Sequence, residues 1–232
     1  MKKLLLALLL IPASLLAQDD DNTLQLGDKD GFHRWEIGLN GGVNLSGVAG
    51  LADTTAGSLI KRAGRLYGGT VVYHFNKFIA FKTDFDFENK GWTLSDQEIV
   101  TNTNGNITEV TDINQYLNYF DIPAFLHIGF GNRLKFDFNF GPYFGFLLED
   151  RAFYTDAAGE QIELLQSEFT GYNNFDWGIT YGGGIDFALG ERVSFGFDML
   201  YQQGLTAIKE GTDLRNTSLD FDFGINFALG KK

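Results

Sequence analysis

The chain has 232 residues, contains no cysteine and carries a formal net charge of −12 at pH 7. The acidic balance argues against nucleic acid as a partner, and the lack of cysteine excludes a disulfide framework and a lipid anchor on a cysteine. The length corresponds to one domain, yet the chain contains 23 Phe, more than a small soluble core needs.

The first residues have the pattern of a secretory signal peptide. Met1-Lys2-Lys3 precedes an apolar run from Leu4 to Leu16, and Ala17 stands before a polar stretch. A basic start, a short apolar segment and a small residue are typical of a cleaved export signal, and the run is too short to span a bilayer as a helix. We therefore expect cleavage after Ala17. The alternative is a buried N-terminal helix.

Eight segments alternate between large apolar residues and small or polar ones, which is the period of a β-strand. In the clearest segment, Phe136, Phe138 and Phe140 share one face, and Lys135 and Asp137 lie on the other. The segments in chain order cover residues 35–45, 65–75, 78–90, 115–129, 134–148, 176–189, 193–205 and 217–229.

Glycine on the polar faces indicates which side of these strands is enclosed. In the segment 35–45, Gly38 and Gly42 stand on the face opposite Trp35 and Leu39. A water-facing strand would carry Lys, Glu or Thr there, because Gly weakens a strand. The polar face is therefore expected to line a crowded interior while the apolar face contacts lipid, as in an outer-membrane β-barrel. The chief structural rival is a soluble lipocalin-like barrel with its Phe side chains inside.

The connections between the segments alternate between long and short. Short connections are expected at Asn76-Lys77, 129–133 and 190–192, with Asn76-Lys77 as a two-residue hairpin turn. Bacterial barrels have an even number of strands, short periplasmic turns and long extracellular loops. The sequence thus predicts an all-β fold, an eight-stranded antiparallel up-and-down transmembrane β-barrel. Pro123 lacks an N–H donor, which predicts a bulge or locally weak pairing.

This interpretation divides the chain into a signal peptide over residues 1–17, a periplasmic tail over residues 18–34 and an outer-membrane barrel over residues 35–232. Aromatic residues near strand ends are candidates for interfacial girdles. These candidates are Trp35, Tyr67, Trp92, Tyr119, Tyr172 and Trp177.

The inward face carries many more acids than bases. Lys82 and Lys135 are the clear inward cations, and Lys90 is expected near the rim. An unpaired desolvated carboxylate costs several kcal/mol, and an eight-stranded barrel is only wide enough to be filled by side chains. We therefore favour a hydrogen-bonded plug over a cation-preferring lumen. The expected lumen polar network is Glu36, Lys82, Asp84, Asp86, Glu88, Asp121, Lys135, Asp137, Asp186, Asp198, Asp220 and Asp222, with Asp176 as a further inward carboxylate.

Catalytic, metal and cofactor sites are not expected. A lipid-modifying hydrolase would need a serine, a histidine and an acid near the outer leaflet. His74 and His127 adjoin short turns and His33 lies in the tail, so the histidines are expected at the periplasmic end. Two inward histidines on different strands, without cysteine, form a weak metal cluster.

Two motifs carry a family resemblance. The run Tyr119–Leu126, with its Ile-Pro pair, and the run Phe140–Phe146, with its Gly-Pro-Tyr pattern, resemble small outer-membrane β-barrels of Bacteroidota. That group includes the "porin family" and PorT-like proteins. The runs Phe175–Gly178, Gly182–Ile185 and Tyr201–Leu205 are similar to its later strands. The resemblance implies a Gram-negative outer-membrane location and no particular substrate.

Three functions remain open on these grounds. The leading hypothesis is a non-enzymatic barrel whose extracellular loops form a binding surface, with at most narrow permeability. The second is a PorT-like assembly factor for outer-membrane protein secretion. The third is a lipid-A-modifying enzyme. The expected partners are outer-membrane lipid and either an extracellular ligand or a protein of the secretion machinery.

Overall fold

The computed structural model describes residues 33–50, 58–95, 98–99, 108–109, 112–155, 160–164 and 170–230. The expected signal peptide and all but the last two residues of the expected tail lie outside these residues. No helix in the described part is long and apolar enough to cross a membrane.

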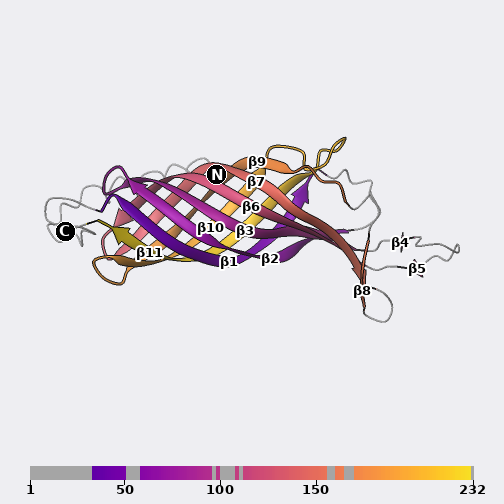
Figure 1. Ribbon diagram of the computed structural model, residues 1–232, viewed down its shortest axis with the longest axis horizontal. Coiled ribbons are helices and arrows are strands. Elements are labelled where there is room, and N and C mark those ends of the chain that lie inside the picture. Colours follow the sequence, from indigo (N-terminus) through magenta and orange to yellow (C-terminus); the bar gives the residue numbers. More distant parts are fainter. Residues whose placement is uncertain are drawn as a thin grey trace, which may run out of the picture.

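Eight long antiparallel strands form a closed ring (Figure 1). The hydrogen-bonded order is β6-β3-β2-β1-β11-β10-β9-β7, and pairing of β6 with β7 closes the ring. The prediction of an eight-stranded up-and-down barrel is therefore confirmed. The strands are β1 (Trp35–Ala49), β2 (Ser58–His74), β3 (Ile79–Ser95), β6 (Asp112–Gly131), β7 (Leu134–Thr155), β9 (Phe175–Ala188), β10 (Val193–Gly204) and β11 (Arg215–Leu229).

The apolar faces of the strands point outward. Leu39 is 70% exposed and Phe136 is 59% exposed, whereas Asp121 and Asp176 on the opposite faces are buried. A lipocalin-like barrel would bury the phenyl rings and expose the carboxylates. The distribution of exposure is thus that of a barrel surrounded by hydrocarbon, in which every second residue meets lipid.

The strands are longer at one end than the sequence pattern indicates. β1 continues to Ala49, β2 begins at Ser58 and β3 reaches Ser95, so part of each expected long loop is strand. The alternation is lost in these extensions, because residues of one kind stand in adjacent pairs there, as in Leu59-Ile60 and Lys61-Arg62.

The predicted two-residue turn at Asn76-Lys77 is wrong. β2 ends at His74 and β3 begins at Ile79, so the connection has four residues. The Asn76 side-chain oxygen accepts hydrogen bonds from the backbone N–H groups of Phe78 and Ile79, at 2.8 and 3.0 Å. An Asn side chain can thus replace a backbone acceptor and stabilise a wider turn.

Pro123 interrupts pairing without shifting the register. The ladder between β3 and β6 stops at the pair Thr83–Ala124 and resumes at Asp86–Asp121. The Thr83 hydroxyl donates to the Pro123 carbonyl at 2.9 Å. The sequence predicted either a bulge or locally weak pairing at Pro123, and the structure shows the weak pairing. The register shift on β6 lies elsewhere, between Asn118 and Tyr119.

Part of the sheet continues beyond the ring at the end with the long connections. β7 pairs with β9 only as far as Phe146, and then continues to Thr155 with β6 on one side and β8 (Gln161–Glu163) on the other. These nine residues extend about 30 Å at ~3.3 Å per residue. A hairpin of β4 (Glu98–Ile99) and β5 (Thr108–Glu109) lies farther along the same side (Figure 1). A small apolar cluster packs inside the extension, formed by Ile113, Ala152, Tyr154 and Leu164.

Candidate functional site

The lumen has three layers along its axis, and the first is an apolar cap at the end with the long connections. Two connecting segments fold over the mouth there. Tyr172 comes from the segment before β9, and Ile208 and Leu214 come from the segment before β11. They pack on Trp92 and Leu117, which point inward from β3 and β6. The mouth at this end is therefore closed by side chains.

Backbone hydrogen bonds join these two segments and close the second segment on itself. The Asn173 N–H donates to the Ile208 carbonyl at 2.7 Å, and the Ile208 N–H donates to the Leu214 carbonyl at 2.8 Å. Burial, with a smaller contribution from the Asp150 carboxylate, raises the pKa of the Tyr172 phenol, so this phenol stays uncharged near neutral pH. The Lys209 ammonium lies over the Tyr172 ring, 5.0 Å from its centre.

Half of the residues expected in an aromatic girdle lie on the outer surface, and the other half lie in the cap. Trp35, Tyr67 and Trp177 are exposed on the outer surface, as a girdle requires. Trp92 and Tyr172 are buried in the cap instead, and so is Tyr119. Composition alone does not separate an aromatic side chain on the rim from one inside the mouth.

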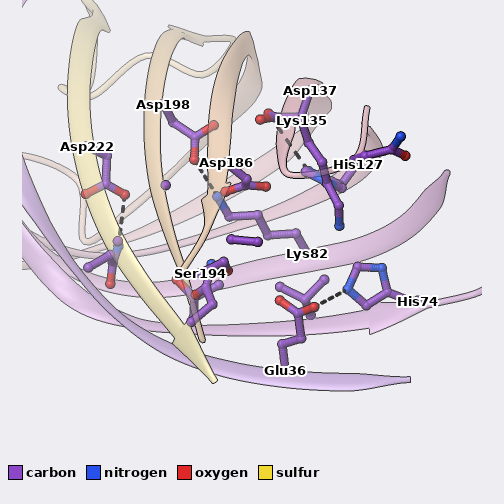
Figure 2. A pocket seen from close by; sticks show the side chains of 18 residues that line it. Glu36, His74, Lys82, His127, Lys135, Asp137, Asp186, Ser194, Asp198 and Asp222 are labelled. Atoms are coloured by element: carbon purple, nitrogen blue, oxygen red, sulfur yellow. Dashed lines mark hydrogen bonds and ion pairs between the residues drawn. The ribbon is translucent and has the colours of Figure 1, made fainter. Parts of the chain in front are cut away.

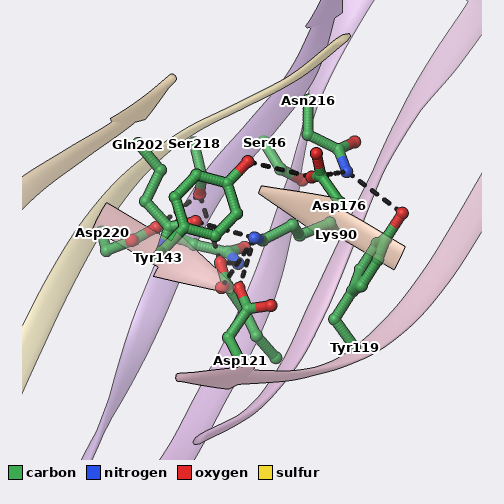
Figure 3. A network of polar contacts seen from close by, with 12 residues as sticks. Ser46, Lys90, Tyr119, Asp121, Tyr143, Asp176, Gln202, Asn216, Ser218 and Asp220 are labelled. Atoms are coloured by element: carbon green, nitrogen blue, oxygen red, sulfur yellow. Dashed lines mark hydrogen bonds and ion pairs between the residues drawn. The ribbon is translucent and has the colours of Figure 1, made fainter. Parts of the chain in front are cut away.

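The second layer is a polar cluster around Lys90 (Figure 3). The Lys90 ammonium forms ion pairs with Asp121 and with Glu88, the latter at 3.2 Å, and donates to the Gln202 side chain at 2.7 Å. Lys90, which was expected near the rim, is buried beneath the cap and only 1% exposed. Its ammonium also lies 4.8 Å from the centre of the Tyr143 ring.

A second set of contacts crosses this layer at Asp176. The Tyr143 hydroxyl donates to one Asp176 oxygen at 2.9 Å, and the Asn216 amide donates to the same oxygen at 2.8 Å. The Thr206 hydroxyl donates to the other oxygen at 3.1 Å. These donors come from β7, β11 and the segment after β10, so one buried carboxylate ties three parts of the wall together.

The third layer is a vestibule that opens at the end with the short turns (Figure 2). Its empty volume, including the open mouth, is about 690 Å³. In the vestibule, the Lys82 ammonium donates to the Asp198 carboxylate at 2.6 Å. The His74 imidazole nitrogen Nε2 lies 2.9 Å from a Glu36 carboxylate oxygen. The lining acids and bases are Glu36, Asp137, Asp186, Asp198, Asp222, Lys82, Lys135, His74 and His127.

The expected network residues divide between these two polar layers. Glu88 and Asp121 contact Lys90, and Asp220 accepts from the Ser218 hydroxyl in the same cluster. Asp84 and Asp86 lie between the layers on β3. No hydrogen bond or ion pair within the described residues engages the side chains of Lys135 or Asp186. The vestibule contains the remaining expected residues, Glu36, Lys82, Lys135, Asp137, Asp186, Asp198 and Asp222.

Several amides and hydroxyls complete the network and were not among the expected site residues. Asn40 donates to Asp86 at 2.7 Å and to Asp222 at 3.2 Å. Asn139 donates to Asp137 at 2.8 Å and to Asp198 at 2.9 Å. Their positions follow the same alternation as the carboxylates, so parity along each strand would have found them if neutral polar residues had been counted with the charged ones.

All three histidines of the sequence lie at the end with the short turns. His74 and His127 line the vestibule, and His33 contacts the Leu229 carbonyl at 3.1 Å. Within the described residues, no group of three or more His, Asp or Glu side chains is arranged to hold a metal ion.

Solved structures with a similar arrangement are small outer-membrane proteins. Ail of Yersinia pestis, in complex with the heparin analogue sucrose octasulfate, is 14% identical with a TM-score of 0.41, covering 84% of this chain and 99% of its own. Neisserial surface protein A is 11% identical with a TM-score of 0.45 (84% and 97%), and OprG from Pseudomonas aeruginosa is 13% identical with a TM-score of 0.44 (87% and 100%). Likenesses at this level carry no information on ligands.

No curated protein sequence matches the chain. The family model of the outer membrane protein beta-barrel domain matches residues 16–210. This range includes seven of the eight barrel strands in full. The chain therefore belongs to the outer membrane protein beta-barrel domain family.

Proposed function

We propose that this protein is a closed, non-enzymatic outer-membrane barrel that presents an ordered binding surface to the cell exterior. The observation that carries the proposal is the contrast between the two ends. The lumen is filled by the cap and the Lys90 cluster, while β6, β7 and β8 continue outward as a sheet. A closed lumen disfavours solute passage, and an ordered extension favours recognition.

The outward side of this extension has the composition of a recognition surface. The Arg62 guanidinium stacks 3.6 Å from the centre of the Tyr116 ring, and the Tyr116 and Phe153 rings meet edge-on at 5.4 Å. Arg151 forms ion pairs with Glu149 and, at 4.0 Å, with Glu163. Aromatic and arginine side chains held in place by neighbours contribute most to binding surfaces. We call Arg62, Tyr116, Glu149, Arg151 and Phe153 the outer ridge.

The closed lumen can be tested by conductance. The purified full chain is inserted into planar bilayers in KCl, and current steps are recorded. We expect no open-channel steps beyond those of the empty bilayer. Regular steps would contradict the proposal, because ions would then pass the cap and the Lys90 cluster.

The outer ridge can be tested by binding with a matched control. The full chain in nanodiscs is screened against purified charged and neutral glycans and matrix proteins, and each binder is measured again with Arg62→Ala, Tyr116→Ala and Arg151→Ala combined. The control combines Lys77→Ala, Phe78→Ala and Arg133→Ala, which removes two cations and one aromatic ring at the opposite end. Binding should fall at least about tenfold in the ridge variant and not in the control. Equal loss in both variants would contradict a ridge-specific site.

A second candidate is a PorT-like assembly factor in a Bacteroidota outer membrane. The Ile-Pro pair at Ile122-Pro123 and the Gly-Pro-Tyr run at Gly141–Tyr143 support it, and so does the vestibule that opens toward the periplasm. Deletion of the gene would then block export of secreted proteins, and the protein would co-purify with secretion components. Normal export in the deletion strain would exclude this role.

A lipid-A-modifying activity is disfavoured by position. The nearest bases to the lumen, His74 and His127, line the periplasmic vestibule, whereas lipid A lies in the opposite leaflet. Mass spectra of lipid A from cells with and without the protein should be identical.

A further inference from the structure

The vestibule carries more negative charge than its own cations neutralise. Five carboxylates and two lysines line it, together with two histidines. The space is a dead end, because the Lys90 cluster and the cap close the lumen beyond it. A concave site with one dominant sign of charge and low-dielectric walls concentrates counter-ions. The vestibule is therefore built to attract a cation from the periplasmic side.

The internal contacts leave specific oxygen atoms without donors. Glu36 is engaged by His74, and Asp198 by Lys82. Asp222 is 6% exposed and receives the Asn40 amide on one oxygen, yet its other oxygen has no hydrogen-bond partner. The side-chain oxygen of Asn40 is also unpartnered. Both residues line the vestibule, and the Asp222 carboxylate points into it (Figure 2).

Asp186 adds a second available carboxylate. It lies opposite Lys135 in the pairing of β7 with β9. No hydrogen bond or ion pair joins its side chain to any other described residue. A buried polar atom without a hydrogen-bond partner is unfavourable. A ligand that supplies N–H donors to Asp222 and Asn40 would remove that cost, and Asp186 would add a second anionic contact.

The spacing of these acceptors selects the type of cation. No three acidic or histidine side chains among the described residues converge on a point where they could hold a metal ion. Dispersed carboxylates instead match a cation whose charges are separated along a chain. We propose that the vestibule binds a polyamine, a flexible alkyl chain with two or more ammonium groups, through Asp186, Asp222 and Asn40.

Lys135 is the natural competitor for this ligand. Its side chain lines the vestibule and its residue pairs with Asp186 across the strands. A flexible lysine can place its ammonium where a ligand ammonium would bind, at a cost in side-chain entropy. Removal of this charge should strengthen polyamine binding, because the competing ammonium is lost and the vestibule becomes more negative.

The test is a calorimetric titration at low salt, in which spermidine is added to the full chain in phosphatidylcholine nanodiscs. The combined variant Asp186→Asn, Asp222→Asn keeps the shape of both side chains and the acceptor for the Asn40 amide. The matched control, Asp213→Asn with Glu163→Gln, removes two carboxylates on the extracellular side, where both residues are exposed. Heat-modifiable migration on gels confirms that each variant is folded.

Wild type and control should bind spermidine with the same affinity, and the vestibule variant should bind about tenfold more weakly. Lys135→Gln should bind more tightly than wild type. No saturable binding to wild type, equal loss in both variants, or equal saturation by Mg²⁺ would overturn the inference. The ridge and the vestibule lie at opposite ends, so failure here is independent of failure of the proposed binding surface.

Discussion

Lys82 on β3 and Asp198 on β10 form an ion pair across the lumen, with 2.6 Å between the ammonium nitrogen and the carboxylate oxygen. Three strands, β2, β1 and β11, separate them around the ring, and 116 positions separate them in sequence. A contact of this kind fixes the barrel diameter directly, because neither side chain can reach its partner along the wall. Lys90 holds the middle of the lumen in the same way.

Lys90→Met should destabilise the barrel strongly. Loss of the ammonium leaves Asp121 and Glu88 buried without their cation, and breaking a buried pair in this way costs about 3–5 kcal/mol. Urea unfolding in lipid vesicles, followed by tryptophan fluorescence, should show a correspondingly lower free energy of unfolding. Lys77→Met, in an exposed turn, should leave it unchanged.

Neutral partners should restore part of that loss. Lys90→Met combined with Asp121→Asn and Glu88→Gln removes the uncompensated charge as well as the cation. We expect the triple variant to be more stable than Lys90→Met alone. If it is less stable, the ion pairs are not the source of the loss.

Substitution by alanine should destabilise the barrel at Gly42 but not at the adjacent Gly41. A Cβ at Gly42 would lie 2.0 Å from the Phe221 carbonyl oxygen, whereas a Cβ at Gly41 would meet nothing closer than 3.6 Å. Gly42→Ala should therefore lower the free energy of unfolding by about 1–3 kcal/mol. Gly41→Ala should change it by less than about 0.5 kcal/mol. Similar values for both, in the same urea assay, would contradict the assigned faces.

The tryptophans should report which side of the wall meets lipid. The sequence has three, and Trp35 and Trp177 are 51% and 38% exposed while Trp92 is 3% exposed in the cap. In variants that retain a single tryptophan, with Phe at the other two positions, brominated phospholipids should quench Trp35 and Trp177. Trp92 should be quenched much less. Strong quenching of Trp92 would place it outside the barrel.

Ile208→Asp should open the cap. Ile208 is fully buried against Trp92 and Tyr172, and a charge there costs several kcal/mol unless the segment moves away. Trypsin added outside intact cells should then cut faster after Lys209 and Arg215. Ile162→Asp, at an exposed position of β8, serves as the control, and equal cleavage in both variants would contradict the packed cap.

Much of this fold can be read from strand alternation. The period of two assigns Phe136 to the lipid side and Asp137 to the lumen side, and the structure agrees. The positions of the strand ends are predicted less accurately. β2 begins seven residues before the expected Arg65, at Ser58. The period of two is not visible there, because Leu59 and Ile60 are adjacent apolar residues and are followed by two adjacent cations.

Alternation along the chain is enough to assign the residues that face lipid, the number of strands in the ring and the excess of acids over bases inside. The parity of each position assigns its side chain to one face, and the alternating segments can be counted. Which acid meets which base depends instead on how the strands pack in three dimensions. This packing places Lys90 at the centre with Gln202 and Asp121, and it brings Trp92 and Tyr172 together in a cap. Those contacts join strands distant in the chain, and their depth depends on the stagger between neighbouring strands, which a period of two leaves open.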